Sequence, residues 1–562
     1  MSDDWSARLK EAIEAGTLGE LVEPLAELLR KDVLDPSAPT DASNQKTIRL
    51  AALHNFCSFY SRVPEIKDVD KKALIWLVDQ QPLFERLALA PGISDFPEQV
   101  LQVYTALWRS DRETIALWPD LVAALCVVWD QTETDSSDTP GALPDWAVWL
   151  YDYFRTANPR LRFSLSDMPW QLQTYVVDVV ISREEAQWLW KRYGQRGEVG
   201  SLYFEVPYDT AAFYQGADKR IAGTLYTLDN LQRLGGVCVD QSYFATQIGR
   251  SMGVPTVTII GQGGGGDVSH AWVGFLENKG KQLAWNLRSG RYEEQLYFTG
   301  SVNDPQTRER ISESETSILS ELQKSSPGNR VLATALLRSV DILTHRQQCD
   351  VVVRSLILSP GQREAWLKLA DLGRDGQLTE AQLDQVKQVV RDFAVKDYAD
   401  LAFEIFVRMM SRQSNLEQIT ALDALVPLFK QKRPDLVARA RLQQGRLHLA
   451  LKNTEPALRA FDDVLRNYLY AGTVVLDTMQ EVDTLLRELK QQRKLAAVYA
   501  HVLGNVPKPQ ASAWASQSVY CQLARSYVNL LDETGDRTTA AKIRAQISAF
   551  ETTISTPAQQ RR

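Results

Sequence analysis

The most informative stretch of this sequence is Gly235-Gly-Val-Cys-Val-Asp-Gln-Ser-Tyr-Phe-Ala-Thr-Gln-Ile-Gly-Arg-Ser-Met-Gly-Val-Pro255. Two glycines precede an amphipathic segment that Gly253 closes in the manner of a helix C-cap, so the pattern predicts a helix beginning at Cys238. A thiol in the first turn of a helix meets the positive end of the helix dipole, which favours the nucleophilic thiolate. The main-chain N–H of Cys238 is then placed to help bind an oxyanion. A lone cysteine at a helix start is nevertheless more often an inert core residue, and it needs partners to act.

The sequence after this helix supplies candidate partners. A strand is expected over residues 254–260, a second strand begins at His270, and a third over residues 282–287 carries Asn286. Because side chains alternate along strands, an odd-numbered loop such as residues 277–279 places His270 opposite Asn286. A two-residue loop would instead place His270 opposite Leu287 and Asn286 on the other face. The register of this hairpin therefore decides whether Cys238, His270 and Asn286 form one site.

The motifs Gly-Gly-Val-Cys-Val-Asp, Met-Gly-Val-Pro-Thr and His-Ala-Trp-Val occur in this order, followed by a tryptophan and a polar residue. They resemble the transglutaminase-like superfamily of papain-related folds, most closely over residues 225–300 and as a domain over 145–310. The resemblance implies that Cys238 is the catalytic nucleophile and His270 its base. Transglutaminases have aspartate as the third member, whereas Asn286 resembles the Cys-His-Asn form of papain-like proteases. An amide can orient the imidazole but adds no charge to stabilise imidazolium.

Two further residues are candidates through the same resemblance. Gln232 lies six residues before Cys238, where papain-like enzymes keep an oxyanion-hole glutamine, and it is therefore our oxyanion candidate. Asp240 resembles an acidic residue that transglutaminase-like proteins often show two positions after the cysteine. Its simpler role is a favourable negative charge at the helix start.

The rest of the chain reads as helices. Residues 1–140 are expected to form an N-terminal helical domain, and a polar stretch at 130–144, either a linker or an exposed loop, leads to the α+β domain at 145–310. Over residues 311–550 the spacing resembles tetratricopeptide repeats of ~34 residues, and a plain helical bundle is the alternative. Trp366, Phe461 and Tyr520 occupy the large positions of three such units and should be buried between helices. Residues 551–562 are expected to be a flexible tail. The predicted fold class is α+β: a transglutaminase-like core flanked by two helical regions.

Composition excludes several classes of protein. The 562 residues are 44 % apolar and 24 % charged, which is typical of globular proteins. A net charge of −7 lacks the basic excess that nucleic acid would require. The longest apolar run, Leu121–Trp129, is about half of the ~20 residues of a membrane-spanning helix. Without a secretory signal at the start, we expect a cytoplasmic protein with no membrane partner.

Metals and nucleotides are not expected either. The five cysteines form no CxxC pair, so neither a disulfide framework nor a thiolate metal site is indicated. The glycines at 263–266 lack the lysine of a phosphate-binding loop and are better explained as a mobile flap. We therefore expect no metal and no cofactor.

These observations predict thiol-dependent acyl transfer on protein or peptide amides, as a protease, an amidase or a transglutaminase-type enzyme. The helical repeats would bind the substrate or protein partners, because stacked repeats form concave surfaces. The alternative is an inactive transglutaminase-like adaptor that acts through its repeats.

Overall fold

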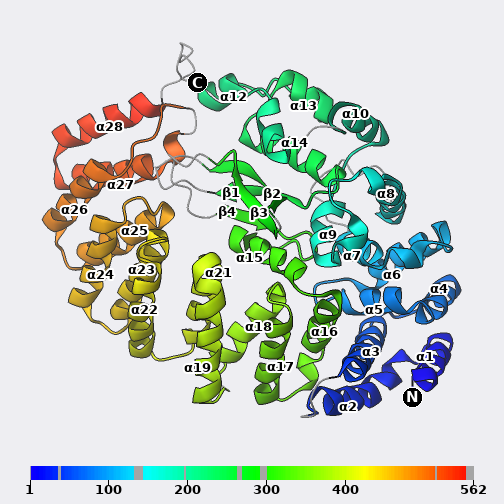
Figure 1. Ribbon diagram of the computed structural model, residues 1–562. Helices are drawn as coiled ribbons and strands as arrows, with labels where there is room; N and C mark the ends of the chain where they lie inside the picture. The colour runs from blue at the N-terminus through cyan, green and yellow to red at the C-terminus, as the bar shows by residue number, and fades with distance from the viewer. Residues whose placement is uncertain are drawn as a thin grey trace.

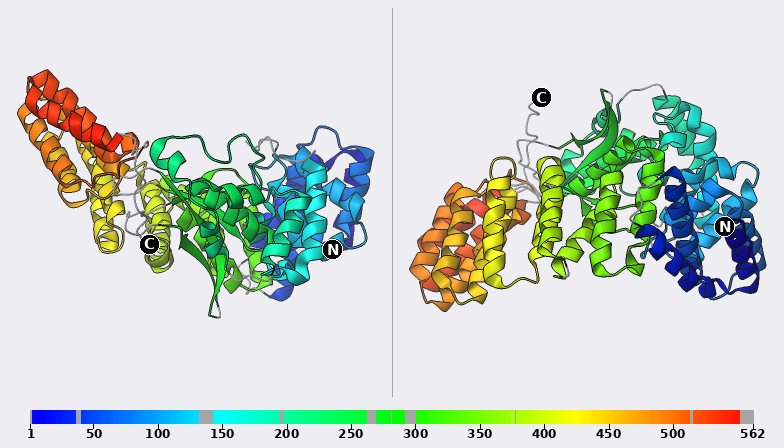
Figure 2. Two further views of the ribbon diagram at one scale, coloured as in Figure 1. Left: turned by 90° about the horizontal axis from the view of Figure 1, so that it is seen from above. Right: turned by 60° about the horizontal axis from the view of Figure 1, so that its bottom comes forward.

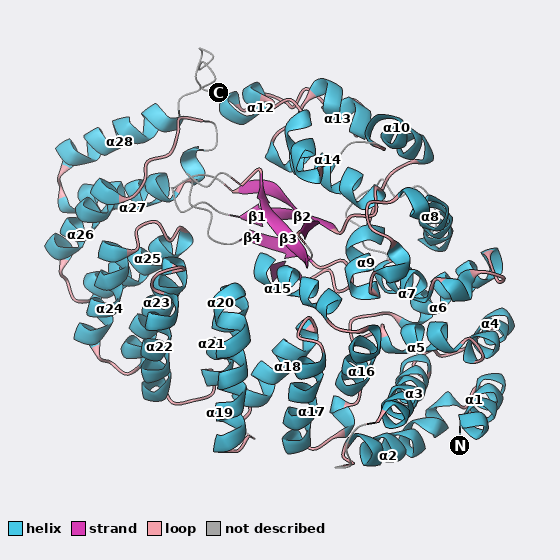
Figure 3. Cartoon of the chain, in the orientation of Figure 1, coloured by secondary structure: helices cyan, strands magenta, loops and turns pink. Residues whose placement is uncertain are grey.

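The computed structural model describes residues 2–35, 40–131, 143–194, 198–261, 269–280, 282–291, 300–376, 378–512 and 515–551. The described chain is mostly helical, with one five-stranded antiparallel sheet near its centre (Figure 3). This agrees with the α+β class. The glycine-rich segment expected to be a flap lies outside the described residues, as do residues 552–562 of the expected tail.

The N-terminal part is a set of helices that pack around a continuous apolar interior. They are α1 (Ser2–Ala15), α2 (Val22–Val33), α3 (Asp41–Tyr60), α4 (Asp68–Val78), α5 (Gln81–Leu89), α6 (Pro97–Ser110) and α7 (Pro119–Val128). The apolar run at 121–129 forms most of α7, and all of its side chains are buried. A helix that is apolar on every side is thus a core helix here.

The middle of the chain contributes further helices and the sheet. The helices are α8 (Leu143–Ala157), α9 (Trp170–Val177), α10 (Arg183–Tyr193), α11 (Val199–Leu202), α12 (Thr210–Gln215), α13 (Leu228–Leu234) and α14 (Cys238–Ser251). The strands are β1 (Thr256–Gly261), β2 (His270–Lys279), β3 (Gln282–Ser289), β4 (Gly300–Asn303) and β5 (Arg310–Ser312). Their order across the sheet is β3-β2-β1-β4-β5, with antiparallel neighbours. Helix α14 packs against β1 and β2 (Figure 1).

The C-terminal part is helical throughout its described residues. Its helices are α15 (Glu313–Ser317), α16 (Pro327–Arg338), α17 (His345–Leu358), α18 (Arg363–Arg374), α19 (Glu380–Val389), α20 (Val395–Asp397), α21 (Ala399–Met410), α22 (Asn415–Phe429), α23 (Pro434–Ala450), α24 (Thr454–Asn467), α25 (Thr473–Glu488), α26 (Gln492–Asn505), α27 (Val519–Thr534) and α28 (Arg537–Glu551). Trp366, Phe461 and Tyr520 are at most 2 % exposed, as the repeat pattern predicted. The helices follow an arc around one side of the sheet (Figure 1).

The arc continues into the N-terminal helices, so that one row of helices curves past the sheet (Figure 2). Helix α16 packs against α3 and α5. Arg338 donates to the carbonyl of Leu89, and Arg30 donates to that of Ile342, each over about 3 Å. One hydrophobic cluster spans residues 9–447 and a second spans 442–547. Residues on both sides of the expected domain boundaries at 140 and 310 therefore belong to the same apolar core.

None of the described helices combines the length and the apolar composition needed to span a bilayer.

Candidate active site

The helix start at Cys238 is built by the two glycines before it. Gly235 has φ +86°, and a Cβ there would lie 2.3 Å from the carbonyl oxygen of Pro207. The Gly236 N–H donates to that same carbonyl over 3.0 Å, and the Gly236 carbonyl accepts from Asp209. Only glycine permits this close passage of two main-chain segments. The two glycines therefore serve the close contact between the start of α14 and the segment at Pro207.

Asp240 fixes the first turn of α14. Its carboxylate accepts the Val237 N–H at 2.8 Å, the Lys219 ammonium at 2.9 Å and the Tyr226 hydroxyl at 2.7 Å. The side chain is 1 % exposed. A buried carboxylate with three donors stabilises both the helix start and the neighbouring loop. This is the helix-start role that the sequence favoured for Asp240.

The Cys238 thiol experiences opposing effects. Burial raises its pKa above the usual value, whereas hydrogen bonds from the main-chain N–H groups of Ala271 and Val239 lower it, and the nearby Asp240 charge raises it. Burial is the largest of these, and the residue is only 7 % exposed. The expected thiolate at the helix N-terminus is therefore not the resting state, because desolvation of the sulfur outweighs the helix amides.

His270 begins β2 and donates through Nε2 to the carbonyl oxygen of Gly290 at 2.6 Å. A carbonyl can only accept, so Nε2 carries the proton and Nδ1 is the basic nitrogen of the neutral ring. Burial lowers the pKa of His270, and the Gly290 carbonyl partly offsets this. The indole of Trp272 packs near the imidazole, with ring centroids 5.9 Å apart. A neutral imidazole with one fixed tautomer is what a general base requires.

Cys238 and the beginning of β2 lie side by side. The N–H that reaches the Cys238 sulfur belongs to Ala271, the residue directly after His270. Helix α14 packs along β2, and Ser242 on this helix donates to the carbonyl of Trp272 at 2.7 Å. The structure therefore brings together the helix start and the strand start that carry the two candidate residues.

Asn286 does not lie opposite His270, and this expectation was wrong. In the register of the hairpin Asn286 pairs with Phe275, because only two residues separate the paired Lys279 and Gln282. Phe275 follows His270 by an odd number of positions, so alternation puts Asn286 on the other face. The Asn286 amide donates to Glu277 at 3.2 Å, and its oxygen accepts from the Arg288 N–H at 3.1 Å.

Gln232 does not have the contacts of an oxyanion donor either. Its amide nitrogen donates to the Tyr193 hydroxyl at 2.6 Å and to the Glu205 carboxylate at 2.9 Å. Both amide protons are thereby used within this cluster. Gln232 lies at the papain-like offset from Cys238 along the sequence, but its side chain is hydrogen-bonded to Tyr193 and Glu205 instead.

The structure adds one group that the sequence did not indicate. The main-chain carbonyl of Gly290 has the orienting role that had been expected of a side chain. Every residue has a main-chain carbonyl, so the residue types in the sequence do not show which carbonyl binds the imidazole. The glycine itself was a weak signal, since it adopts φ +82° directly after β3.

No group of three or more His, Cys, Asp or Glu residues that could hold a metal ion occurs within the described part of the chain. No protein-family model matches this sequence, and neither a curated protein nor a solved structure matches it.

Proposed function

We propose that the protein is a thiol-dependent acyl-transfer enzyme in which Cys238 is the nucleophile and His270 the general base. The observation that carries the proposal is the Nε2–Gly290 hydrogen bond, because it makes Nδ1 the proton acceptor at the strand start beside Cys238. The transglutaminase-like resemblance supports the same pair of residues and the same order along the chain.

The ground state that these pKa directions favour is a neutral pair. The thiol pKa is raised and the imidazole pKa is lowered, so both groups are uncharged near neutral pH. His270 Nδ1 takes the thiol proton as the sulfur bonds to the carbonyl carbon of an amide. The C–N bond then breaks and the amine leaves with that proton, and water or a second amine attacks the thioester. The main-chain N–H of Cys238 is the candidate oxyanion donor.

Exposed apolar side chains near this site support a protein or peptide substrate. Val239 directly follows Cys238 and is 42 % exposed, and Phe204 is 61 % exposed. Phe204 adjoins Tyr203, whose hydroxyl donates to the Ala271 carbonyl at 2.9 Å. Apolar side chains that stay exposed at these positions suit contact with the side chains of a peptide. The helical array is the proposed binding surface for larger partners.

The second candidate function is a non-catalytic adaptor that acts through its helices. The deep burial and raised pKa of Cys238 favour it, because an unreactive thiol needs neither access nor a base. Cytoplasmic location and the absence of nucleic-acid partners are expected for both functions.

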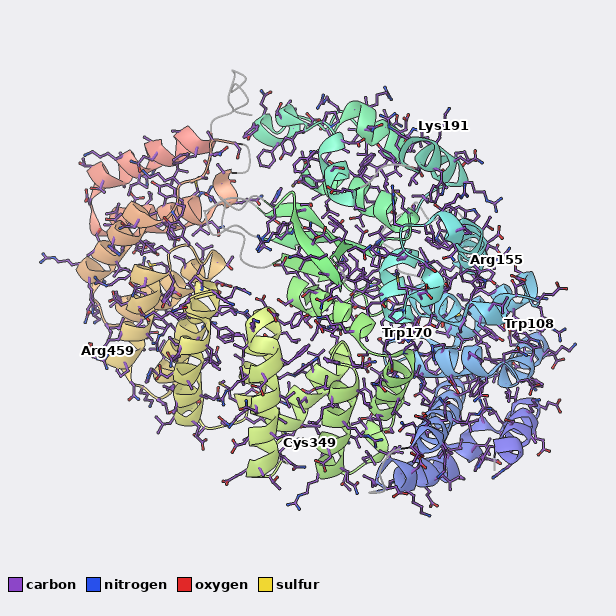
Figure 4. All side chains as sticks on the ribbon, in the orientation of Figure 1. Trp108, Arg155, Trp170, Lys191, Cys349 and Arg459 are labelled. Carbon is purple, nitrogen blue, oxygen red and sulfur yellow. The ribbon has the colours of Figure 1, made fainter. Side chains whose placement is uncertain are left out.

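The test is to incubate the full chain with a tryptic digest of casein, quench it in acid and measure the intact mass. A catalytic thiol should give an acyl adduct on Cys238 that hydroxylamine removes, because it is a thioester. Cys238→Ala and His270→Ala should lack the adduct. Cys349→Ala should retain it, since Cys349 lies on α17, away from the sheet (Figure 4). A wild-type chain with no hydroxylamine-sensitive adduct overturns the enzyme proposal in favour of the adaptor.

A further inference from the structure

The segment that carries the Gly290 carbonyl is held from two sides. Gly290 has φ +82°, and a Cβ there would lie 2.7 Å from the Tyr203 ring. Tyr203 in turn donates to the carbonyl of Ala271, the residue after His270. One aromatic side chain thus contacts both the residue that orients the imidazole and the strand that bears it.

Arg291, the next residue, holds the segment from the other side. Its guanidinium forms an ion pair with Glu313 at 2.8 Å, and the two side chains are 14 % and 8 % exposed. The same guanidinium lies 5.2 Å from the centre of the Trp272 ring, which packs near His270. Burial raises the pKa of Glu313 to about 7 and the Arg291 charge lowers it, so the pair is ionic above that pH, and loss of the arginine would leave the carboxyl group without its counter-charge.

Glu313 is the first residue of α15, and this helix is fixed to the helical array. The Ser314 hydroxyl donates to Asp400 at the start of α21 over 2.8 Å. Asp400 also binds Arg433, which pairs with Asp435. Both acidic side chains in this group are largely buried. A chain of buried polar contacts therefore runs from the array to the residue beside Gly290.

We infer that Arg291, anchored by Glu313, is a positioning residue that holds the Gly290 carbonyl on Nε2 of His270 and so fixes the imidazole tautomer. The inference rests on the proposed function for its role in catalysis. The tautomer itself is a property of the resting protein and can be measured without substrate.

The experiment compares Arg291→Ala and Arg291→Lys with the wild-type chain. The tautomer of His270 is read from ¹⁵N and ¹³C shifts of the labelled histidines, with His270 assigned by a His270→Gln variant. The second measurement is the rate of Cys238 alkylation by iodoacetamide. Arg291→Ala should lower the population of the Nε2-protonated tautomer and slow alkylation roughly tenfold to hundredfold. Arg291→Lys keeps the positive charge near Glu313, so its tautomer population and its alkylation rate should be close to those of the wild-type chain.

Arg363→Ala is the matched control. Arg363 pairs with Glu315, on the same helix α15, and the two side chains are 14 % and 17 % exposed. Its loss should reduce thermal stability to a similar degree as Arg291→Ala while leaving the tautomer and the alkylation rate unchanged. Glu313→Gln removes the other charge of the Arg291–Glu313 pair, and it replaces Arg291→Ala in the experiment if that variant does not fold.

An unchanged His270 tautomer in Arg291→Ala and in Glu313→Gln overturns the inference, as does an equal change in Arg363→Ala. If the wild-type chain forms no acyl adduct, the proposed function fails, and the tautomer measurement still decides the positioning role.

Discussion

The reactivity of Cys238 depends on the balance between burial and the main-chain amides at the sulfur. Burial dominates and raises the thiol pKa, so at pH 7 we expect iodoacetamide to react more slowly with Cys238 than with a free thiol. The rate should increase with pH, because deprotonation supplies the thiolate that reacts. Cys238 should still react faster than Cys57, whose pKa burial raises to about 12 without help from such amides. Mass spectrometry of alkylated peptides across pH 6–10 measures both rates; equal rates would contradict the role of the amides.

The imidazole of His270 should titrate below its ordinary value. Burial disfavours the charged ring, and the folded pKa is therefore depressed. By linkage, the stability that the neutral ring contributes is present above the unfolded pKa of about 6.5 and is lost as pH falls through the folded value. NMR titration of His270 gives this pKa directly. A midpoint above 6.5 would show that a carboxylate or another anion, rather than burial, controls the ring.

At the scale of the hairpin, the main chain after β3 matters more than the Asn286 side chain. Gly290→Ala puts a Cβ against the Tyr203 ring at a positive φ, and should cost about 1–3 kcal/mol of unfolding free energy while weakening the bond to His270. Asn286→Ala should cost less than about 1 kcal/mol and leave Cys238 alkylation unchanged. Urea denaturation with alkylation rates tests both. A large loss of acyl-adduct formation in Asn286→Ala would restore the role expected from the sequence.

Within the helical array, helix pairing depends on small residues at particular contacts. A Cβ on Gly445 of α23 would lie 2.1 Å from the ring of Phe461 on α24. Gly445→Ala should therefore destabilise the array by roughly 1–3 kcal/mol through overpacking. Gly504→Ala in α26 is the control, since nothing lies within 4 Å of its added Cβ, and it should stabilise by about 0.5–1 kcal/mol. Hydrogen exchange of α23 and α24 locates the effect; slower exchange in Gly445→Ala would contradict it.

At the scale of the molecule, two buried carboxyl groups lie where the N-terminal helices meet the turn after β4. Asp95 accepts from Gln306 at 2.8 Å, and Asp130 accepts from the Phe96 N–H at 2.8 Å. Burial raises the pKa of Asp95 to about 6 and, together with the Asp95 charge, that of Asp130 to about 8. Both folded pKa values exceed the unfolded 3.8. The stability these groups contribute is therefore fully present below that value and is lost as pH rises to about 8.

Asp130→Asn should remove much of this dependence. At pH 9 the variant should be more stable than the wild-type chain by about 1–3 kcal/mol, because it carries no buried charge there. At pH 5 the difference should be small. Asp341→Asn is the control, since that side chain is 88 % exposed. Thermal unfolding at the two pH values measures the difference in stability between Asp130→Asn and the wild-type chain. An equal gain in stability at pH 5 and pH 9 would rule out ionisation of Asp130 as the cause.

Local side-chain patterns were enough to predict several elements of this protein, among them the helix start that carries Cys238 and the strand start that carries His270. Periodicity and glycine placement gave the helix that begins at Cys238, the strand that begins at His270 and the buried aromatics of the array, because these are local consequences of side-chain pattern. Which side chains contact one another follows from the folded arrangement. The two-residue turn moved Asn286 to the other face, the contacts with Tyr193 and Glu205 engaged Gln232, and a main-chain carbonyl became the partner of His270. The turn of the hairpin is local, but residue types there allowed either loop length and so did not choose between the two registers. The contacts of Gln232 depend on residues distant in sequence, and a main-chain carbonyl is the same in every residue, so no local pattern could have shown these two.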